Sequence, residues 1–178
     1  VILASRSPRR LDILRQHGIE PIVLPADTEE ILPEGIGMEE AVRLLALQKA
    51  QACYNEIRNN RSYRDSVIIG SDTIVYKDRI MGKPADASDA FRMLASIRND
   101  VHFVSTGVAL IDFNTGEERV LSDVTRVICR DYTDAEIWEY IEKEQPYDKA
   151  GSYAIQGPFG RYIDRIEGDY ENVVGLPY

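Results

Sequence analysis

Residues 1–24 read VILASRSPRRLDILRQHGIEPIVL and carry the pattern of a strand, a helix and a second strand. The apolar run VILA at the start is short and predicts a buried strand. Ser7 and Pro8 predict the start of a helix, because serine is a common N-cap residue and proline is tolerated at the first helical position. Gly18 ends this helix, and residues 19–24 predict the second strand. Strands that alternate with helices are typical of α/β proteins.

The rest of the chain continues this alternation and then becomes richer in strands. Apolar residues at helical spacing predict a long helix over residues 38–57. Two alternating segments, 103–113 and 120–130, predict a hairpin. Further predicted elements are a strand at 67–70 that continues extended at 74–76, helices at 87–97 and about 133–144, and short strands with loops at 151–174. We therefore expect one α/β domain over residues 1–178, with a mixed central sheet and flanking helices.

The charge balance limits the partners of this chain. Lys and Arg number 21 and Asp and Glu number 30, which gives a formal net charge of -9 over 178 residues. An acidic surface disfavours stable binding of nucleic acid through its phosphates. A small anionic ligand is still compatible with this charge, because a few basic side chains can be focused in one cleft.

Cysteine usage and hydropathy give two further expectations. Cys53 and Cys129 lie outside any CxxC or Cys/His-rich pattern, so no structural zinc site is expected, and two lone thiols fit a reducing compartment such as the cytoplasm. No apolar run is long enough to predict a membrane span, and the opening residues lack the order of a signal peptide. Since the sequence starts at Val1 rather than at a methionine, we expect terminal residues to be missing from it.

The first candidate site is Ser5-Arg6-Ser7-Pro8-Arg9-Arg10. A strand followed by a helix start leaves free backbone N–H groups at the strand's carboxyl end, which is a natural anion site. The hydroxyls of Ser5 and Ser7 can add donors, and the guanidinium groups of Arg9 and Arg10 can grip phosphate oxygens. A capped helix with two solvated arginines explains the same residues equally well. The pattern is not a Walker loop.

The second candidate site is Ile68-Ile69-Gly70-Ser71-Asp72-Thr73-Ile74-Val75, in which an apolar run delivers Asp72 to its polar end. Burial of an isolated carboxylate is costly unless it binds a cation or donors. A carboxylate beside a hydroxyl suits Mg²⁺ or a polarised water. An Asx turn that closes the strand is an equal alternative.

Three further polar residues carry weaker signals. Lys83 stands in a Gly/Pro turn before a helix and suits a phosphate, although a surface lysine is the simpler interpretation. Gln156 lies in a Gly-bounded apolar stretch, where its amide can read a base edge or be satisfied by backbone. Lys49 lies on an alanine-rich helix face, where a snorkelling surface lysine is usual. His17 and His102 are interpreted as structural, because both lie far from any motif partner in the sequence, and no Ser/His/Asp triad is visible.

The order of these motifs is similar to that of the Maf family. The motifs are S-x-S-P-R-R, S-D-T, G-K-P, S-T-G-V, K-A-G-x-Y-x-I-Q-G and G-D-Y-x-N-V-V-G-L-P, at residues 5–10, 71–73, 82–84, 105–108, 149–157 and 168–177. The resemblance covers nearly the whole chain. It departs at the C-terminus, where the family continues with a further short helix.

The resemblance implies a fold and an activity. The fold is related to that of inosine-triphosphatase-like pyrophosphatases, with two lobes around a cleft and a homodimer. The activity is the hydrolysis of nucleoside triphosphates to monophosphate and pyrophosphate with a divalent cation, Mg²⁺ with Mn²⁺ and Co²⁺ as alternatives. The family is also linked to arrest of cell division and to removal of non-canonical nucleotides.

The resemblance also implies roles for single residues. Asp72 falls on the proton acceptor or metal-linked carboxylate, and Glu30 falls on a further acid, with the neighbouring Glu29 left open. The residues that fall where the family holds phosphates are Ser7, Arg10, Lys49 and Lys83, and Ser5 belongs to the same motif.

Three positions bear on the choice of nucleotide. Arg9, Thr73 and Gln156 resemble the branch of the family that acts on dTTP and UTP, whereas the branch acting on 7-methyl-GTP tends to carry Trp in place of this Arg and Glu in place of this Gln. A neutral amide can pair with the imide edge of a pyrimidine, and a carboxylate would suit a cationic methylated guanine.

The expected mechanism is attack of water at a phosphorus atom, with pyrophosphate leaving. Basic side chains and the cation would neutralise the phosphates, and Asp72 would orient or deprotonate the water. Three other functions stay open from the sequence: a nucleotide- or nucleic-acid-binding regulator without catalysis, a structural partner in cell division with an exposed apolar patch, and a phosphatase of monophosphates. Asp72 disfavours the first, because binding alone does not need a carboxylate beside phosphates.

Overall fold

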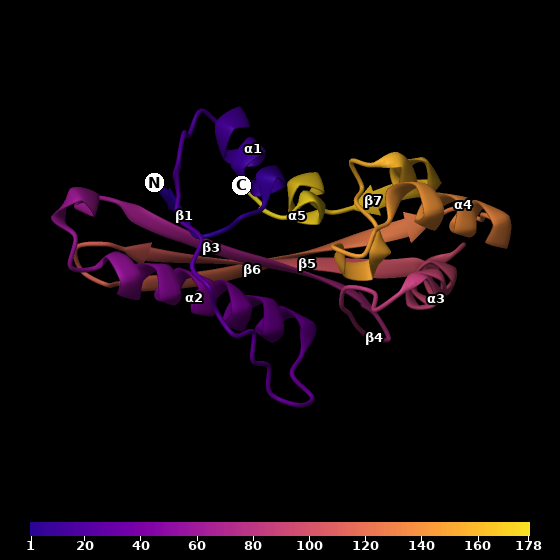
Figure 1. Cartoon of the computed structure of the whole chain (residues 1–178), viewed down its shortest axis with the longest axis horizontal. Coiled ribbons are helices and arrows are strands. Elements are labelled where there is room, and N and C mark those ends of the chain that lie inside the picture. The colour runs from indigo at the N-terminus through magenta and orange to yellow at the C-terminus, as the bar shows by residue number, and fades with distance from the viewer.

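A seven-stranded mixed sheet runs along the length of the molecule (Figure 1). The computed structural model describes residues 1–178. Its strands are β1 (Ile2–Leu3), β2 (Ile22–Val23), β3 (Val67–Lys77), β4 (Arg79–Met81), β5 (Val101–Asp112), β6 (Glu118–Cys129) and β7 (Ile163–Glu167). The strand order is β2-β1-β3-β5-β6-β7, and β4 pairs with β3. β1 is parallel to β2 and β3 and all other pairs are antiparallel, which confirms the expected mixed α/β architecture.

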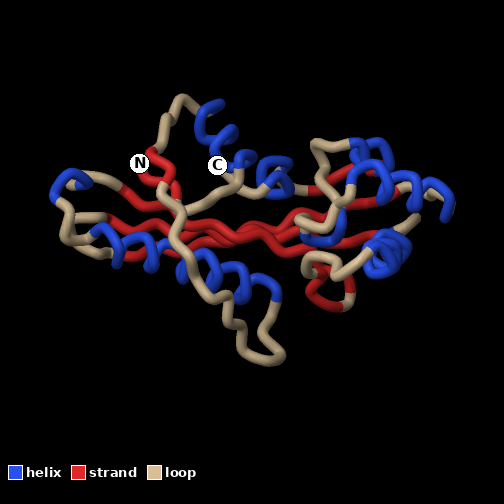
Figure 2. Tube along the Cα trace, viewed as in Figure 1, coloured by secondary structure: helices blue, strands red, loops and turns tan.

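The helices lie on both faces of the sheet (Figure 2). They are α1 (Pro8–Gln16), α2 (Met38–Ile57), α3 (Ala87–Ile97), α4 (Asp134–Glu144) and α5 (Tyr170–Val174). The predicted bounds of α2 and α3 are confirmed, and so is the hairpin of β5 and β6. Asp86 caps α3, and Thr133 forms a capping box with Glu136 at the start of α4. No helix combines the length and the apolar character that crossing a bilayer requires.

Two glycines allow α2 to pack against the backbone of the sheet. A Cβ atom on Gly70 would lie 2.3 Å from the carbonyl oxygen of Ala46, and one on Gly107 would lie 2.1 Å from that of Val42. Any side chain larger than hydrogen would therefore push α2 off the sheet. This close approach brings Lys49, on α2, next to β3.

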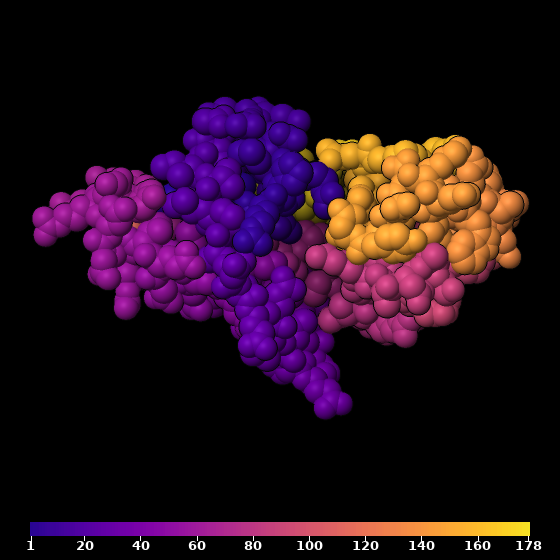
Figure 3. All heavy atoms as spheres, viewed as in Figure 1, coloured from indigo at the N-terminus to yellow at the C-terminus, as the bar shows by residue number.

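Buried apolar residues gather at the two ends of the sheet. At one end α3 and α4 pack on the sheet around a cluster of 16 buried residues, five of which are aromatic. At the other end smaller clusters lie between the sheet, α1 and α2. We call the end with α1 and α2 the N-terminal lobe and the end with α3 and α4 the C-terminal lobe. Figure 3 shows the two as separate masses on either side of a depression.

Two predictions about secondary structure are wrong. The polar residues Ser71, Asp72 and Thr73 do not interrupt a strand, because β3 continues through them while paired with β5 over its whole central part. Residues 151–174 were expected to form short strands, but they hold one strand, β7, together with two 3₁₀ turns at 150–152 and 158–162 and helix α5.

Candidate active site

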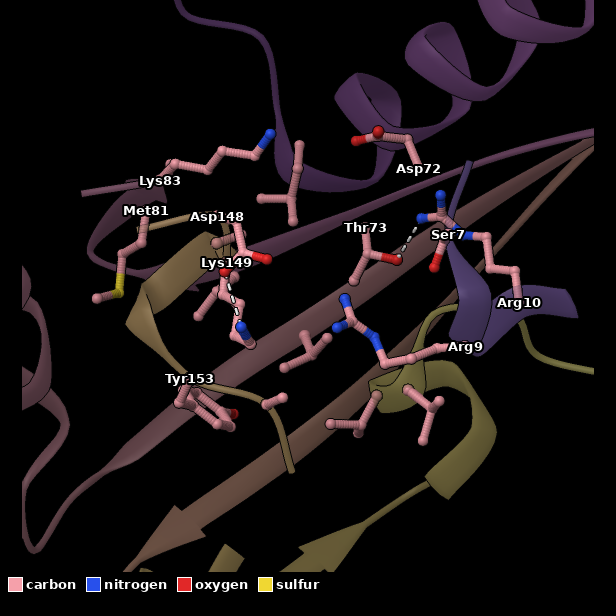
Figure 4. Close-up of a pocket in the computed structure, with 18 of the residues that line it drawn as sticks. Ser7, Arg9, Arg10, Asp72, Thr73, Met81, Lys83, Asp148, Lys149 and Tyr153 are labelled. Atoms are coloured by element: carbon pink, nitrogen blue, oxygen red, sulfur yellow. Dashed lines mark hydrogen bonds and ion pairs between the residues drawn. The ribbon is translucent and has the colours of Figure 1, made fainter. Parts of the chain in front are cut away.

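A cleft of about 580 Å³ lies between the two lobes. Cavities of this size are typical of sites for small ligands. All but one of the candidate residues line it, namely Ser7, Arg9, Arg10, Glu30, Lys49, Asp72, Thr73, Lys83 and Gln156. The exception is Ser5, which lies behind Arg10. Residues that are far apart in the sequence are therefore neighbours in one cavity (Figure 4).

The floor of the cleft is an open stretch of the edge of β3. β1 pairs with β3 at Ile68 and Ile69, and β4 pairs with it from Val75 onward. Between these two partners the edge has no neighbouring strand, and Asp72 and Thr73 lie there. Since side chains alternate along a strand, Asp72 points toward α2 and Thr73 points toward α1. Asp72 thus lies in the middle of a strand rather than at the polar end of one, and the Asx turn is excluded.

Lys49 joins two carboxylates at this edge. Its ammonium contacts Asp72 Oδ1, and its Nζ lies 2.9 Å from Glu30 Oε1. The side chains of Lys49 and Asp72 are only 19% and 14% exposed. Each buried charge is therefore stabilised by the opposite charge of its partner. The interpretation of Lys49 as a snorkelling surface lysine is therefore wrong. Glu30 lines the cleft and Glu29 does not.

Arg10 is fixed by three hydrogen bonds. Nε donates to the carbonyl of Gly175 at 2.7 Å, and the two terminal nitrogens donate to Ser5 Oγ and Thr73 Oγ1, both at 3.1 Å. Burial lowers the pKa of Arg10 from its usual value, and the nearby Asp72 carboxylate opposes this shift. The guanidinium is therefore a rigidly held charge beside Asp72, and Ser5 holds it from behind.

The start of α1 supplies donors to the cleft. Ser7 occupies the N-cap position, as expected, but its hydroxyl makes no capping bond, so this oxygen is available to a ligand. Its backbone N–H donates to Ser5 Oγ at 3.2 Å. Arg6 and Arg9 both line the cleft, and Arg6 also forms an exposed ion pair with Asp27 at 2.7 Å. Free N–H groups at a helix start attract anions.

The C-terminal lobe adds a second wall. Lys83 is exposed in the loop after β4, and the backbone of this loop is tied to the segment 149–157 because Gly151 N–H donates to Gly82 O at 3.1 Å. Gln156 is exposed on that segment, so the alternative of a buried glutamine is wrong. Figure 4 shows Arg9 and Lys149 pointing into the same space.

Two residues of this wall, Lys149 and Tyr153, were not predicted from the sequence as site residues. Lys149 lines the cleft and pairs with Asp148 at 2.7 Å, and Tyr153 lines it from below. Both belong to the motif K-A-G-x-Y-x-I-Q-G that singled out Gln156. Their place in this motif was the signal that could have found them.

The electrostatics of the cleft differ from those of the chain. Six basic side chains line it, namely Arg6, Arg9, Arg10, Lys49, Lys83 and Lys149, and they outnumber its three acids, Glu30, Asp72 and Asp148, although the net charge of the protein is -9. Charge of one sign in a concave site attracts and orients an anion of opposite sign.

The acids of the cleft fit a divalent cation. The carboxylates of Asp72 and Glu30 both contact the one ammonium of Lys49, so they converge on a position that a cation favours. Mg²⁺ is commonly bound by one or two carboxylates together with phosphate oxygens of the substrate. The protein holds no cluster of three or more His, Cys, Asp or Glu residues of the kind that binds a metal ion alone. Oxygens of the substrate or water would therefore complete the coordination.

Comparison with known proteins gives a consistent family. The sequence model of a family described as Maf-like protein matches residues 1–178. The chain is 44% identical over 178 residues to a dTTP/UTP pyrophosphatase of Desulfitobacterium hafniense (strain Y51), covering 99% of this chain and 80% of the relative. It is also similar to proteins of the same name from Alkaliphilus oremlandii (strain OhILAs), 44% identical, and Dictyoglomus turgidum (strain DSM 6724 / Z-1310), 45% identical, and each match covers 99% of this chain and 90% of the relative.

Proposed function

The chain belongs to the Maf family, and from this premise we propose that it is a nucleoside triphosphate pyrophosphatase that hydrolyses dTTP and UTP to the monophosphate and pyrophosphate. The observation that carries the proposal is that six basic side chains and Asp72 line one cleft. A triphosphate needs such an arrangement, because its charge must be neutralised before an oxygen nucleophile can approach.

The chemistry follows from the position of Asp72. The oxygen of a water molecule forms a bond to the α-phosphorus, while the bond from this phosphorus to the oxygen shared with the β-phosphorus breaks. Asp72 accepts a proton from the water, and pyrophosphate leaves with the shared oxygen. Arg10 and Lys83 stabilise the charge that develops on the phosphate oxygens. A divalent cation held by Asp72 and Glu30 would supply further neutralisation; Mg²⁺, Mn²⁺ and Co²⁺ are the candidates.

Recognition of the base is assigned to Arg9, Thr73 and Gln156, the three positions that resemble the branch of the family that acts on dTTP and UTP. Thr73 lies on the floor, Arg9 on one wall and Gln156 on the other. The amide of Gln156 can both donate to and accept from the imide edge of thymine or uracil. Its exposure leaves the amide free to turn toward a base.

The cellular setting is proposed from the family resemblance. The protein acts in the cytoplasm as a homodimer, removes non-canonical nucleotides from the pool, and takes part in arrest of cell division. Sedimentation of the purified protein checks the dimer. Sequencing of DNA from cells grown with modified pyrimidines checks the role in the nucleotide pool.

Product analysis tests the proposed activity. dTTP, UTP, 7-methyl-GTP and ATP are incubated with the protein and Mg²⁺ or Mn²⁺, and monophosphate, pyrophosphate and phosphate are quantified. We expect monophosphate and pyrophosphate in equal amounts from dTTP and UTP. Release of phosphate alone would indicate a phosphatase, and binding without turnover would indicate a nucleotide-binding regulator.

Two variants connect the activity to the cleft. Asp72→Asn should lower the rate of pyrophosphate release by about 10² to 10⁴, because the amide cannot accept the proton of the water. Asp164→Asn is the matched control, since this exposed carboxylate lies on β7 and pairs with Arg165 at 3.2 Å. If both variants kept the wild-type rate, Asp72 would not be the base.

A further inference from the structure

His102 is a buried residue outside the cleft whose side chain holds a residue inside it. It lies on β5 and is 0% exposed. Its Nε2 lies 2.5 Å from the hydroxyl oxygen of Tyr153, and the two rings meet edge to face with centroids 5.5 Å apart. Val104, two residues along the same face of β5, lines the cleft. His102 thus forms the layer directly beneath this part of the wall.

The protons of this pair can be placed. Burial lowers the pKa of His102 to about 4, so the imidazole is neutral and has one donor and one acceptor. Burial raises the pKa of Tyr153, so its hydroxyl keeps its proton. The His102 Nδ1 faces the sulfur of Cys129 at 3.9 Å. The arrangement that satisfies each group has Tyr153 donating to Nε2 and Nδ1–H directed at this sulfur.

Tyr153 is one of two anchors of the segment that carries Gln156. The first anchor is at Gly151, where the backbone is bonded to Gly82 and rests on Val75; a Cβ atom at Gly151 would lie 2.9 Å from Cγ1 of that valine. The second is the Tyr153 side chain, which is 7% exposed and packs against Phe159.

A turn follows these two anchors, closed by the Gly157 N–H bond to Ala154 O at 3.0 Å. Gln156 lies within this turn and is exposed. The direction in which Tyr153 leaves the backbone therefore sets the place of the turn and of its amide.

We propose that His102 is a positioning residue for recognition of the base: it fixes Tyr153, and through Tyr153 the turn that presents Gln156 to a pyrimidine. The inference deepens the proposed function and rests on it. The basic groups beside Asp72 are held independently of Tyr153, since Arg10 is fixed by Gly175, Ser5 and Thr73. Loss of the His102–Tyr153 bond should therefore weaken base selection and leave binding of the phosphates intact.

The test removes the hydroxyl of Tyr153 and compares it with a matched buried hydroxyl. Tyr132 belongs to the same aromatic cluster, donates its hydroxyl to Leu94 O at 2.6 Å, and does not line the cleft. Tyr153→Phe and Tyr132→Phe each leave one buried acceptor without a partner. Both should lower the melting temperature by similar amounts.

Only Tyr153→Phe should change selectivity. We expect its ratio of kcat/KM for dTTP over dCTP to fall about tenfold, through a higher KM for dTTP, as the loss of one fixed hydrogen-bonding group predicts. Inhibition by inorganic tripolyphosphate, which has no base, should stay within about twofold of wild type. His102→Gln should have the same effect as Tyr153→Phe, and the double variant should add nothing further.

Two results would overturn the role proposed for His102, and a third would overturn the proposed function. Equal selectivity in the Tyr153→Phe and Tyr132→Phe proteins would overturn the inference, and so would an equal loss of tripolyphosphate binding in Tyr153→Phe. If wild type releases no pyrophosphate from dTTP, the proposed function fails. The inference is then decided by the same comparison made with equilibrium binding of dTTP, dCTP and tripolyphosphate.

Discussion

The wall of the cleft that comes from the N-terminal lobe is held by ionic and polar contacts, whereas the wall from the C-terminal lobe rests on an aromatic core. In the first wall, Lys49 bridges two carboxylates and Arg10 has three fixed acceptors. In the second, Tyr153 packs against Phe159 with ring centroids 5.0 Å apart, and its hydroxyl is hydrogen-bonded to the buried His102.

This difference separates the two tasks of the site. A preorganised set of charges lowers the energy of a phosphoryl transition state without moving. A base is read by shape and by a few neutral donors and acceptors, so its wall needs rigidity rather than charge. Changes to Asp72, Lys49 or Arg10 should therefore lower the rate for every nucleotide, and changes to Tyr153 or Gln156 should alter which nucleotide is preferred.

Among the groups that hold the phosphates, the largest expected effect comes from Arg10 in the first wall. Arg10→Lys keeps the charge but cannot make the three bonds that fix the guanidinium. We expect kcat/KM for dTTP and UTP to fall by about 10² to 10³. Arg15→Lys is the control, because Arg15 lies on the same helix and forms an exposed pair with Glu20 at 2.7 Å. Equal rates for the two variants in steady-state kinetics would show that the fixed geometry of Arg10 is unimportant.

The next effect concerns the contact that holds Lys49 in place. Gly107→Ala would set a methyl group 2.1 Å from a backbone oxygen of α2, and should lower the free energy of unfolding by about 2 to 4 kcal/mol. Gly82→Ala has open space around its Cβ and should stay within about 0.5 kcal/mol of wild type. Denaturant unfolding measures both. If Gly107→Ala left the free energy of unfolding unchanged, α2 would be able to move away from the sheet without loss of stability.

Much of this fold could be predicted because its signals are local. The helical spacing of apolar residues placed α2 and α3, and alternation placed the hairpin of β5 and β6. The unbroken course of β3 could not be predicted, because Ser71, Asp72 and Thr73 have the composition of a turn. Their pairing with β5 is what keeps them extended, and the partner is more than 30 residues away in the sequence.

The residues of the cleft also fall into two groups: those that local motifs predict and those whose position depends on tertiary packing. The motifs placed Asp72, Arg10 and Gln156 in one cleft without any structure. Lys49 has no local signal, because its meeting with Asp72 depends on the packing of α2 across two glycines. Glu30 lies in a loop without periodicity, so its choice over Glu29 needed coordinates.

A smaller effect should distinguish Glu30 from the adjacent Glu29. Glu30→Gln should raise the Mg²⁺ concentration that gives half of the maximal rate by about tenfold, because one carboxylate of the proposed cation site is lost. Glu29→Gln changes the neighbouring side chain, which does not line the cleft, and should behave as wild type. A metal titration at fixed dTTP measures both. The reverse order would move the second acid to Glu29.

The division between the walls is tested most directly by kcat and KM of wild type, Asp72→Asn and Gln156→Glu with dTTP and with 7-methyl-GTP. Asp72→Asn should lower the rate for both nucleotides by about 10² to 10⁴. Gln156→Glu should shift the preference toward 7-methyl-GTP by about tenfold and change kcat much less. If Gln156→Glu instead lowered both rates equally, or if Asp72→Asn changed only the preference, the assignment of chemistry to Asp72 and of base selection to Gln156 would be contradicted.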